Sequence, residues 1–157
     1  MTPPPADKPT QSKPHPESLS LEFDLPHAPE KVWRALTDPA LLADWLLPVV
    51  GFRPEPGAAF TFKTQAYPGW DGTVSCRILE IEANRKISYT WSVPFLDTAV
   101  TFTLTPMRGE SGAGASGTRL SIVQSGFKPD QKREFGGARY GWKMMGEKLV
   151  ALLARMP

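Results

Sequence analysis

The sequence predicts an α+β domain in which a bent antiparallel sheet wraps around one long C-terminal helix. Residues 138–156 repeat apolar side chains at spacings of three and four, which form one stripe along an α-helix: Ala138, Trp142, Met145, Leu149, Leu152, Leu153 and Met156. Between residues 19 and 127, short segments alternate apolar and polar residues, as half-buried strands do. A sheet with one apolar face needs a cover, and the long helix supplies it.

Size and composition fit one domain with a tail. A chain of 157 residues can bury roughly two thirds of its unfolded surface. Its single cysteine, Cys76, rules out an intrachain disulfide and favours a reducing compartment. The N-terminus lacks the pattern of a secretory signal, and no apolar run is long enough to span a membrane. We therefore expect a cytoplasmic protein without a membrane span.

The charge pattern argues against nucleic acid as a partner. The formal net charge is +2, and Lys and Arg are scattered among Asp and Glu, whereas phosphate contacts need clustered basic groups. Aromatic residues are abundant, with five Trp and eight Phe. Large rings fill cores, and they also line apolar cavities. The oligomeric state is left undecided by the sequence.

Two regions differ sharply in composition. Residues 1–17 combine prolines with polar residues and predict a disordered, Pro-rich tail, either a passive extension or a PxxP docking segment. Residues 18–157 contain the apolar patterns and form the predicted domain. The change in composition at residue 18 therefore marks the predicted start of the folded domain.

The domain begins with a strand and two short helices. Residues 19–25 alternate apolar and polar side chains, and a proline ends this strand. Residues 29–37 begin with proline, a residue favoured in the first turn of a helix. Asp38 before Pro39 predicts an N-cap for a second short helix that reaches Trp45. Both helices interrupt the sheet after its first strand.

Further strands complete a predicted six-stranded sheet. They cover Phe60–Thr64, Val74–Ile78, Ile87–Val93, Val100–Leu104 and Leu120–Gln124. Short connections predict antiparallel neighbours. The alternation changes phase at Leu79, which predicts a β-bulge near Ile78. A Gly- and Ser-rich loop over residues 106–117 connects the last two strands.

Several strings of residues carry a family resemblance. In chain order they are APEKVWRALTDP at 28–39, Trp45, Pro56-Gly57, Gly72-Thr73-Val74, Leu79-Glu80-Ile81, Tyr89-Thr90-Trp91, Gly117-Thr118-Arg119-Leu120, Ser125-Gly126-Phe127 and Gly141-Trp142. Together they resemble the START-like or SRPBCC superfamily, and within it the homologues of the activator of heat-shock-protein-90 ATPase, over about residues 19–153. The resemblance implies a helix-grip fold with a cavity between sheet and helix, where many superfamily members bind lipids, hormones or polyketide-like molecules. It also implies a chaperone as an alternative partner.

No set of residues has the spacing of a metal or catalytic site. His15 and His27 lack ligand-type companions, and no GxSxG string occurs. Residues 112–117 match GxGxxG, yet they precede a strand and not the helix that pyrophosphate binding requires. Cys76 is in phase with buried neighbours and predicts an inert thiol. Arg77 is the one ionisable interior candidate that the phase change leaves open. We expect no cofactor, no metal and no catalytic residue.

Aromatic and thioether side chains form the candidate ligand site. The set consists of Trp45, Phe60, Phe62, Tyr89, Trp91, Phe102, Trp142 and Met145. Each residue alone is equally well explained as core, but together they fit an apolar pocket between sheet and helix. The leading hypothesis is non-enzymatic binding of a small hydrophobic or amphipathic molecule. The alternatives are a chaperone-associated or stress-response interaction module, and a polyketide-cyclase-like or hydrolase-like enzyme, which requires a buried ionisable group.

Overall fold

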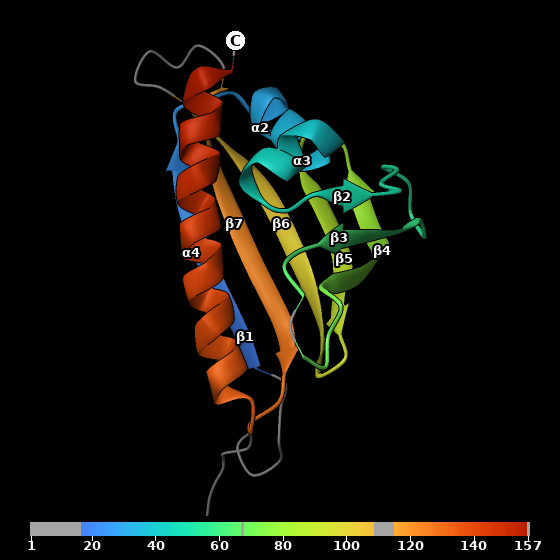
Figure 1. Cartoon of the computed structure of the whole chain (residues 1–157). Coiled ribbons are helices and arrows are strands. Elements are labelled where there is room, and N and C mark those ends of the chain that lie inside the picture. The colour runs from blue at the N-terminus through green and yellow to red at the C-terminus, as the bar shows by residue number, and fades with distance from the viewer. Residues whose placement is uncertain (1–16, 67, 109–114, 157) are drawn as a thin grey trace, which may run out of the picture.

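A curved antiparallel sheet and one long helix dominate the computed structural model, which describes residues 17–66, 68–108 and 115–156 (Figure 1). Within these ranges the elements are β1 (Glu17–Leu25), α2 (Pro29–Thr37), α3 (Pro39–Trp45), β2 (Val49–Val50), β3 (Ala59–Lys63), β4 (Thr73–Glu82), β5 (Lys86–Val93), β6 (Leu96–Arg108), β7 (Ala115–Phe127) and α4 (Lys132–Arg155). The strand order is β1-β7-β6-β5-β4-β3-β2. The predicted α+β helix-grip fold is confirmed. The predicted tail lies, up to residue 16, outside the described residues.

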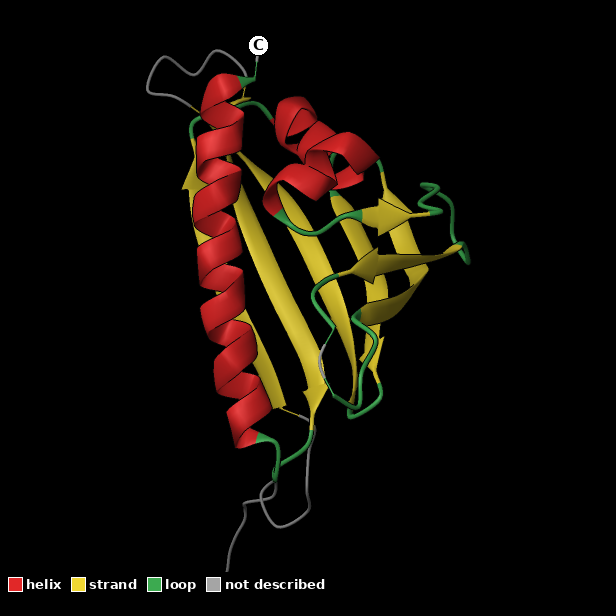
Figure 2. Cartoon of the chain, in the orientation of Figure 1, coloured by secondary structure: helices red, strands yellow, loops and turns green. Residues whose placement is uncertain are grey.

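The two short helices form as the sequence predicts. Pro29 is the first residue of α2, and the side chain of Asp38 caps α3 by accepting a hydrogen bond of 2.9 Å from the backbone nitrogen of Ala40. The indole nitrogen of Trp45 donates to the carbonyl of Ala35 at 2.8 Å and ties α3 to α2. Both helices lie over one end of the sheet, beside the C-terminal part of α4 (Figure 2).

The sheet differs from the six-stranded prediction in two places. A seventh strand, β2, pairs with β3, and its two residues are too few to show an alternating pattern. The loop predicted over residues 106–117 is shorter at both ends, because the ladder of β6 and β7 continues through the pairs Pro106–Thr118 and Met107–Gly117. Residues 109–114 lie outside the described chain. The predicted bulge is confirmed by a register shift between Ile78 and Glu80.

Helix α4 begins at Lys132, six residues before the predicted start of the apolar stripe at Ala138. The rings of Phe135 and Phe127 meet edge to face, 5.2 Å apart, so tertiary packing extends the helix through two glycines with low helix propensity. Leu149 and Leu153, two residues of the predicted apolar stripe, are fully buried. No helix in the described part of the chain is long and apolar enough to cross a membrane.

Contacts with the short helices hold the C-terminal end of α4. The ammonium group of Lys31 on α2 donates to the carbonyl of Met156 at 3.0 Å, and Arg155 pairs with Asp44 at 3.1 Å. The N-terminal half of α4 is farther from α2 and α3 and lies opposite the hairpin of β5 and β6 (Figure 1). This half of the helix borders a cavity.

Candidate functional site

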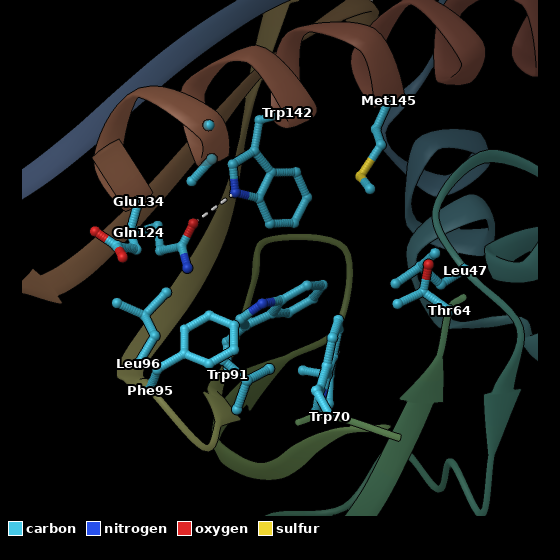
Figure 3. A pocket seen from close by; sticks show the side chains of 15 residues that line it. Leu47, Thr64, Trp70, Trp91, Phe95, Leu96, Gln124, Glu134, Trp142 and Met145 are labelled. Carbon is cyan, nitrogen blue, oxygen red and sulfur yellow. Dashed lines mark hydrogen bonds between the residues drawn. The ribbon is translucent and has the colours of Figure 1, made fainter. Parts of the chain in front are cut away.

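A cavity of about 410 Å³ lies between the N-terminal half of α4 and the end of the sheet (Figure 3). Helix α4 contributes Glu134, Gly137, Ala138, Gly141, Trp142 and Met145 to its lining. The hairpin of β5 and β6 contributes Trp91, Val93, Phe95 and Leu96, and the rest of the chain contributes Leu47, Thr64, Trp70, Val74 and Gln124. The volume falls in the range of about 300–1,000 Å³ that is typical of small-molecule pockets.

Small residues on α4 leave the space open. Apart from its chain neighbours and the backbone of α4 itself, a Cβ atom added to Gly137 or Gly141 would have no heavy atom within 4 Å. Ala138 lies between them in the sequence and also lines the cavity. The absence of side chains at these two positions therefore contributes to the volume of the cavity.

Two pairs of aromatic rings form the cavity walls. The ring centroids of Trp91 and Trp142 lie 5.4 Å apart at an interplanar angle of 57°, and those of Trp70 and Phe95 lie 6.1 Å apart at 80°. The side-chain nitrogen of Gln131 donates to the carbonyl of Phe95 at 3.1 Å. This bond ties the turn between β5 and β6 to the start of α4, so the two opposing sides of the cavity are connected.

A buried hydrogen-bond chain fixes the tryptophans. The indole nitrogen of Trp142 donates to Oε1 of Gln124 at 2.8 Å, and Nε2 of Gln124 donates to Oγ1 of Thr98 at 2.9 Å. Thr98 in turn donates to the carbonyl of Trp91 at 2.8 Å. Gln124 is only 1% exposed. The carboxamide therefore holds both tryptophan walls in place and is a neutral polar group at the cavity.

The comparisons with known proteins agree with this architecture. Residues 26–154 match the model of the family described as activator of Hsp90 ATPase homolog 1-like protein. The chain belongs to this family. No curated protein matches the chain.

Solved structures of similar proteins share the fold over most of their length. Protein MLL2253 from Mesorhizobium loti is 39% identical, with a TM-score of 0.79, over 90% of this chain and 99% of that one. Protein CV1439 from Chromobacterium violaceum is 29% identical, with a TM-score of 0.68, over 87% and 96% of the two chains. Protein NE0264 from Nitrosomonas europaea is 25% identical, with a TM-score of 0.69, over 88% and 94%.

In this member of the family, the predicted ligand-site residues separate into two groups. Trp91, Trp142 and Met145 line the cavity. The others are at most 4% exposed and belong to the core: Trp45, Phe60, Phe62, Tyr89 and Phe102. They form the layer behind the cavity, because Phe62 lies 5.4 Å from Trp91 and Phe102 lies 5.7 Å from Trp142, measured between ring centroids.

Several cavity residues were missed by sequence reasoning. Gln124 carried a usable signal, since it is in phase with the inward-facing Leu120 and Ile122, where a polar residue must find a buried partner. Trp70 and Phe95 lie in connections without periodicity, so nothing in the pattern placed them at the cavity.

Two ionisable side chains buried among the described residues, Cys76 and Tyr89, are neutral at pH 7. Burial raises the pKa of the Cys76 thiol to about 12, in keeping with the predicted inert thiol. Burial also raises the pKa of Tyr89 well above its usual value. Arg77 is exposed, and its guanidinium donates to the carbonyl of Gly57 at 2.8 Å, so the open question about its direction is answered: it faces away from the cavity. Glu134 is the one carboxylate among the lining residues.

Proposed function

We propose that this protein binds a small, largely apolar molecule in the cavity between α4 and the hairpin of β5 and β6. The observation that carries the proposal is the composition of the cavity: aromatic walls fixed by the hydrogen bonds of Gln124, and a floor of glycine and alanine that leaves room for a ligand. Pockets with apolar walls and a few oriented polar groups are typical of ligand sites. Trp91, Trp142 and Met145 contact the ligand, and the rings behind them keep that wall rigid.

The polar groups near the cavity support binding more than catalysis. Among the described residues, the buried polar side chains are Ser88, Thr98, Thr118 and Gln124, and none of these four exchanges a proton near neutral pH. General acid or base catalysis depends on a group whose pKa lies near the working pH, and the one carboxylate of the lining, Glu134, is half-buried with no second carboxylate or histidine beside it in the lining. A polyketide-cyclase-like or hydrolase-like activity therefore has less support than simple binding.

Filling the cavity tests the proposal directly. Wild-type protein is titrated with the neutral fluorescent probe N-phenylnaphthylamine, and saturable binding is expected. Gly141→Leu places a side chain in the cavity, where space is available, and should weaken probe binding about tenfold or more because the volume is occupied. Gly136→Leu is the matched control, since Gly136 also has free space for a Cβ atom but does not line the cavity.

The control must bind like wild type, and both variants must unfold cooperatively. If wild type shows no saturable binding, or if Gly141→Leu binds the probe as well as Gly136→Leu does, the ligand does not occupy this cavity and the proposal fails.

A second candidate is a chaperone-associated interaction through the outer face of α4. Tyr140 and Met144 lie one helical turn apart and are 66% and 45% exposed. The family description names Hsp90 ATPase activation. If this role holds, the protein stimulates the ATPase of an Hsp90-type chaperone, and Tyr140→Ser with Met144→Ser removes the stimulation without changing probe binding. Absence of stimulation by wild type removes this candidate.

A further inference from the structure

The walls of the cavity combine aromatic rings with a single carboxylate. Trp70, Trp91, Phe95 and Trp142 contribute rings, and Glu134 contributes the charge. Among the described residues that line the cavity there is no Lys, Arg or His. We infer that the ligand is an organic cation, a quaternary or tertiary amine with an apolar body; this inference rests on the proposed function.

The arrangement of the rings suits a cation. Trp142 lies on one side of the space, and Trp91, Phe95 and Trp70 lie on the other (Figure 3). The ring planes meet at 57° within one pair and at 80° within the other, so neither pair stacks face to face, and all four rings line the same cavity. The faces of aromatic rings carry negative potential and attract ammonium groups placed within about 6 Å of the ring centroid.

Glu134 is the residue that gives the cavity lining a negative formal charge. This residue lies in the first turn of α4, is half-buried and lies at the outer edge of the lining beside Gln124, with its carboxylate directed away from the space between Trp142 and Trp91 (Figure 3). The neighbouring Lys132 and Arg133 are exposed and do not line the cavity. Arg139 lies over the ring of Phe135, 5.6 Å from its centroid, and is also absent from the lining.

Ligands of different charge would meet different environments. An anion would approach Glu134 with no basic lining residue to balance the repulsion, and a neutral molecule would gain nothing from the carboxylate. A cation would gain from the carboxylate and from the ring faces together, and both attractions are stronger at a site from which the ligand excludes water.

Three probes of nearly the same shape separate charge from apolar contact. Benzyltrimethylammonium is the cation, neopentylbenzene is its neutral isostere, and benzylsulfonate is the anion. Binding is measured by calorimetry and by tryptophan fluorescence at low ionic strength. The cation should bind at least about tenfold tighter than the anion, and its affinity should fall as salt is added.

Substitutions assign the preference to named groups. Glu134→Gln should weaken the cation about three- to tenfold and change the neutral isostere less than about twofold. Glu147→Gln, on the same helix but away from the cavity, is the control and should change neither probe. Phe95→Leu keeps an apolar side chain at a half-exposed position, and should weaken the cation about two- to fivefold while sparing the neutral isostere.

The outcomes distinguish the two proposals. If neither N-phenylnaphthylamine nor any of the three probes binds, the proposed function itself fails; if only N-phenylnaphthylamine binds, the binding function stands and the cation inference is overturned. If the neutral isostere binds but the cation does not, or if the two probes respond equally to Glu134→Gln, the binding function stands and the cation inference is overturned. An equal effect of Glu147→Gln would overturn it too, because the preference would then reflect the overall charge of the helix.

Discussion

The indole nitrogen of Trp142 on α4 donates a hydrogen bond of 2.8 Å to the carboxamide oxygen of Gln124 on β7. Both side chains are buried, with exposed fractions of 3% and 1%. This contact connects the helix to the sheet at the cavity, and it sets the position of the ring that faces Trp91. Stability and the shape of the cavity therefore depend on the same pair of residues.

Replacing Gln124 by leucine should destabilise the fold by about 1–3 kcal/mol, because the buried indole donor of Trp142 loses its acceptor. The measurement is urea unfolding followed by circular dichroism. A double-mutant cycle with Trp142→Phe should give a coupling energy of about 0.5–3 kcal/mol, as expected for residues in direct contact. Gln131→Leu, which removes two exposed hydrogen bonds, one from the backbone nitrogen of Lys128 and one to the carbonyl of Phe95, is the control and should cost less. Additive single effects in the cycle would contradict the role assigned to the pair.

Two glycines of α4 should respond with opposite sign to alanine. At Gly146 a Cβ atom would lie 2.2 Å from the ring of Phe23, so in Gly146→Ala the half-buried ring must leave its place against α4, which should destabilise the fold by about 1–3 kcal/mol. At Gly141 no atom lies within 4 Å, and Gly141→Ala should stabilise by up to about 1 kcal/mol through helix propensity. Thermal and urea unfolding compare the two. A stable Gly146→Ala protein would show that the helix does not approach the strand this closely.

The hydroxyl of Tyr89 is buried among rings and has no hydrogen-bond partner among the described residues. Tyr89→Phe should therefore leave the free energy of unfolding unchanged or raise it by about 1 kcal/mol, since a buried polar atom without a partner is removed. Equilibrium unfolding measures this. Probe binding should also persist, because Tyr89 lies behind the cavity wall. A large loss of stability would reveal a partner for the hydroxyl.

Alkaline pH should destabilise the protein through Cys76. Burial raises its pKa from 9.0 to about 12 in the folded state, so between these values the unfolded chain has lost the proton that the folded chain retains. Stability is then fully present below pH 9.0 and falls as the pH rises towards 12. Unfolding measured at intervals from pH 8 to 11 should show this decline, and Cys76→Ala should make it shallower. Parallel curves for the two proteins would contradict it.

Much of the fold could be predicted from local patterns. The alternation in β5 and β7, the proline at the start of α2 and the side-chain cap by Asp38 each depend on neighbouring residues alone. The bulge after Ile78 was readable because it shifts the phase of the alternation. Strand β2 and the first turn of α4 were not readable, because they exist through pairing with β3 and packing against Phe127.

The candidate site also has some features that local sequence predicts and others that depend on tertiary contacts. The sequence by itself determined that α4 has one apolar stripe and that Trp142 and Met145 belong to it, because helical periodicity is a local property. Only the tertiary structure decided which aromatic rings face open space and which are core. It brought Trp70, Phe95 and Glu134 from separate connections and the start of α4 to one cavity. These residues come together because the sheet is curved, and the space between them stays open because Gly137 and Gly141 have no side chains. The spacing of residues within one segment predicts neither of these features.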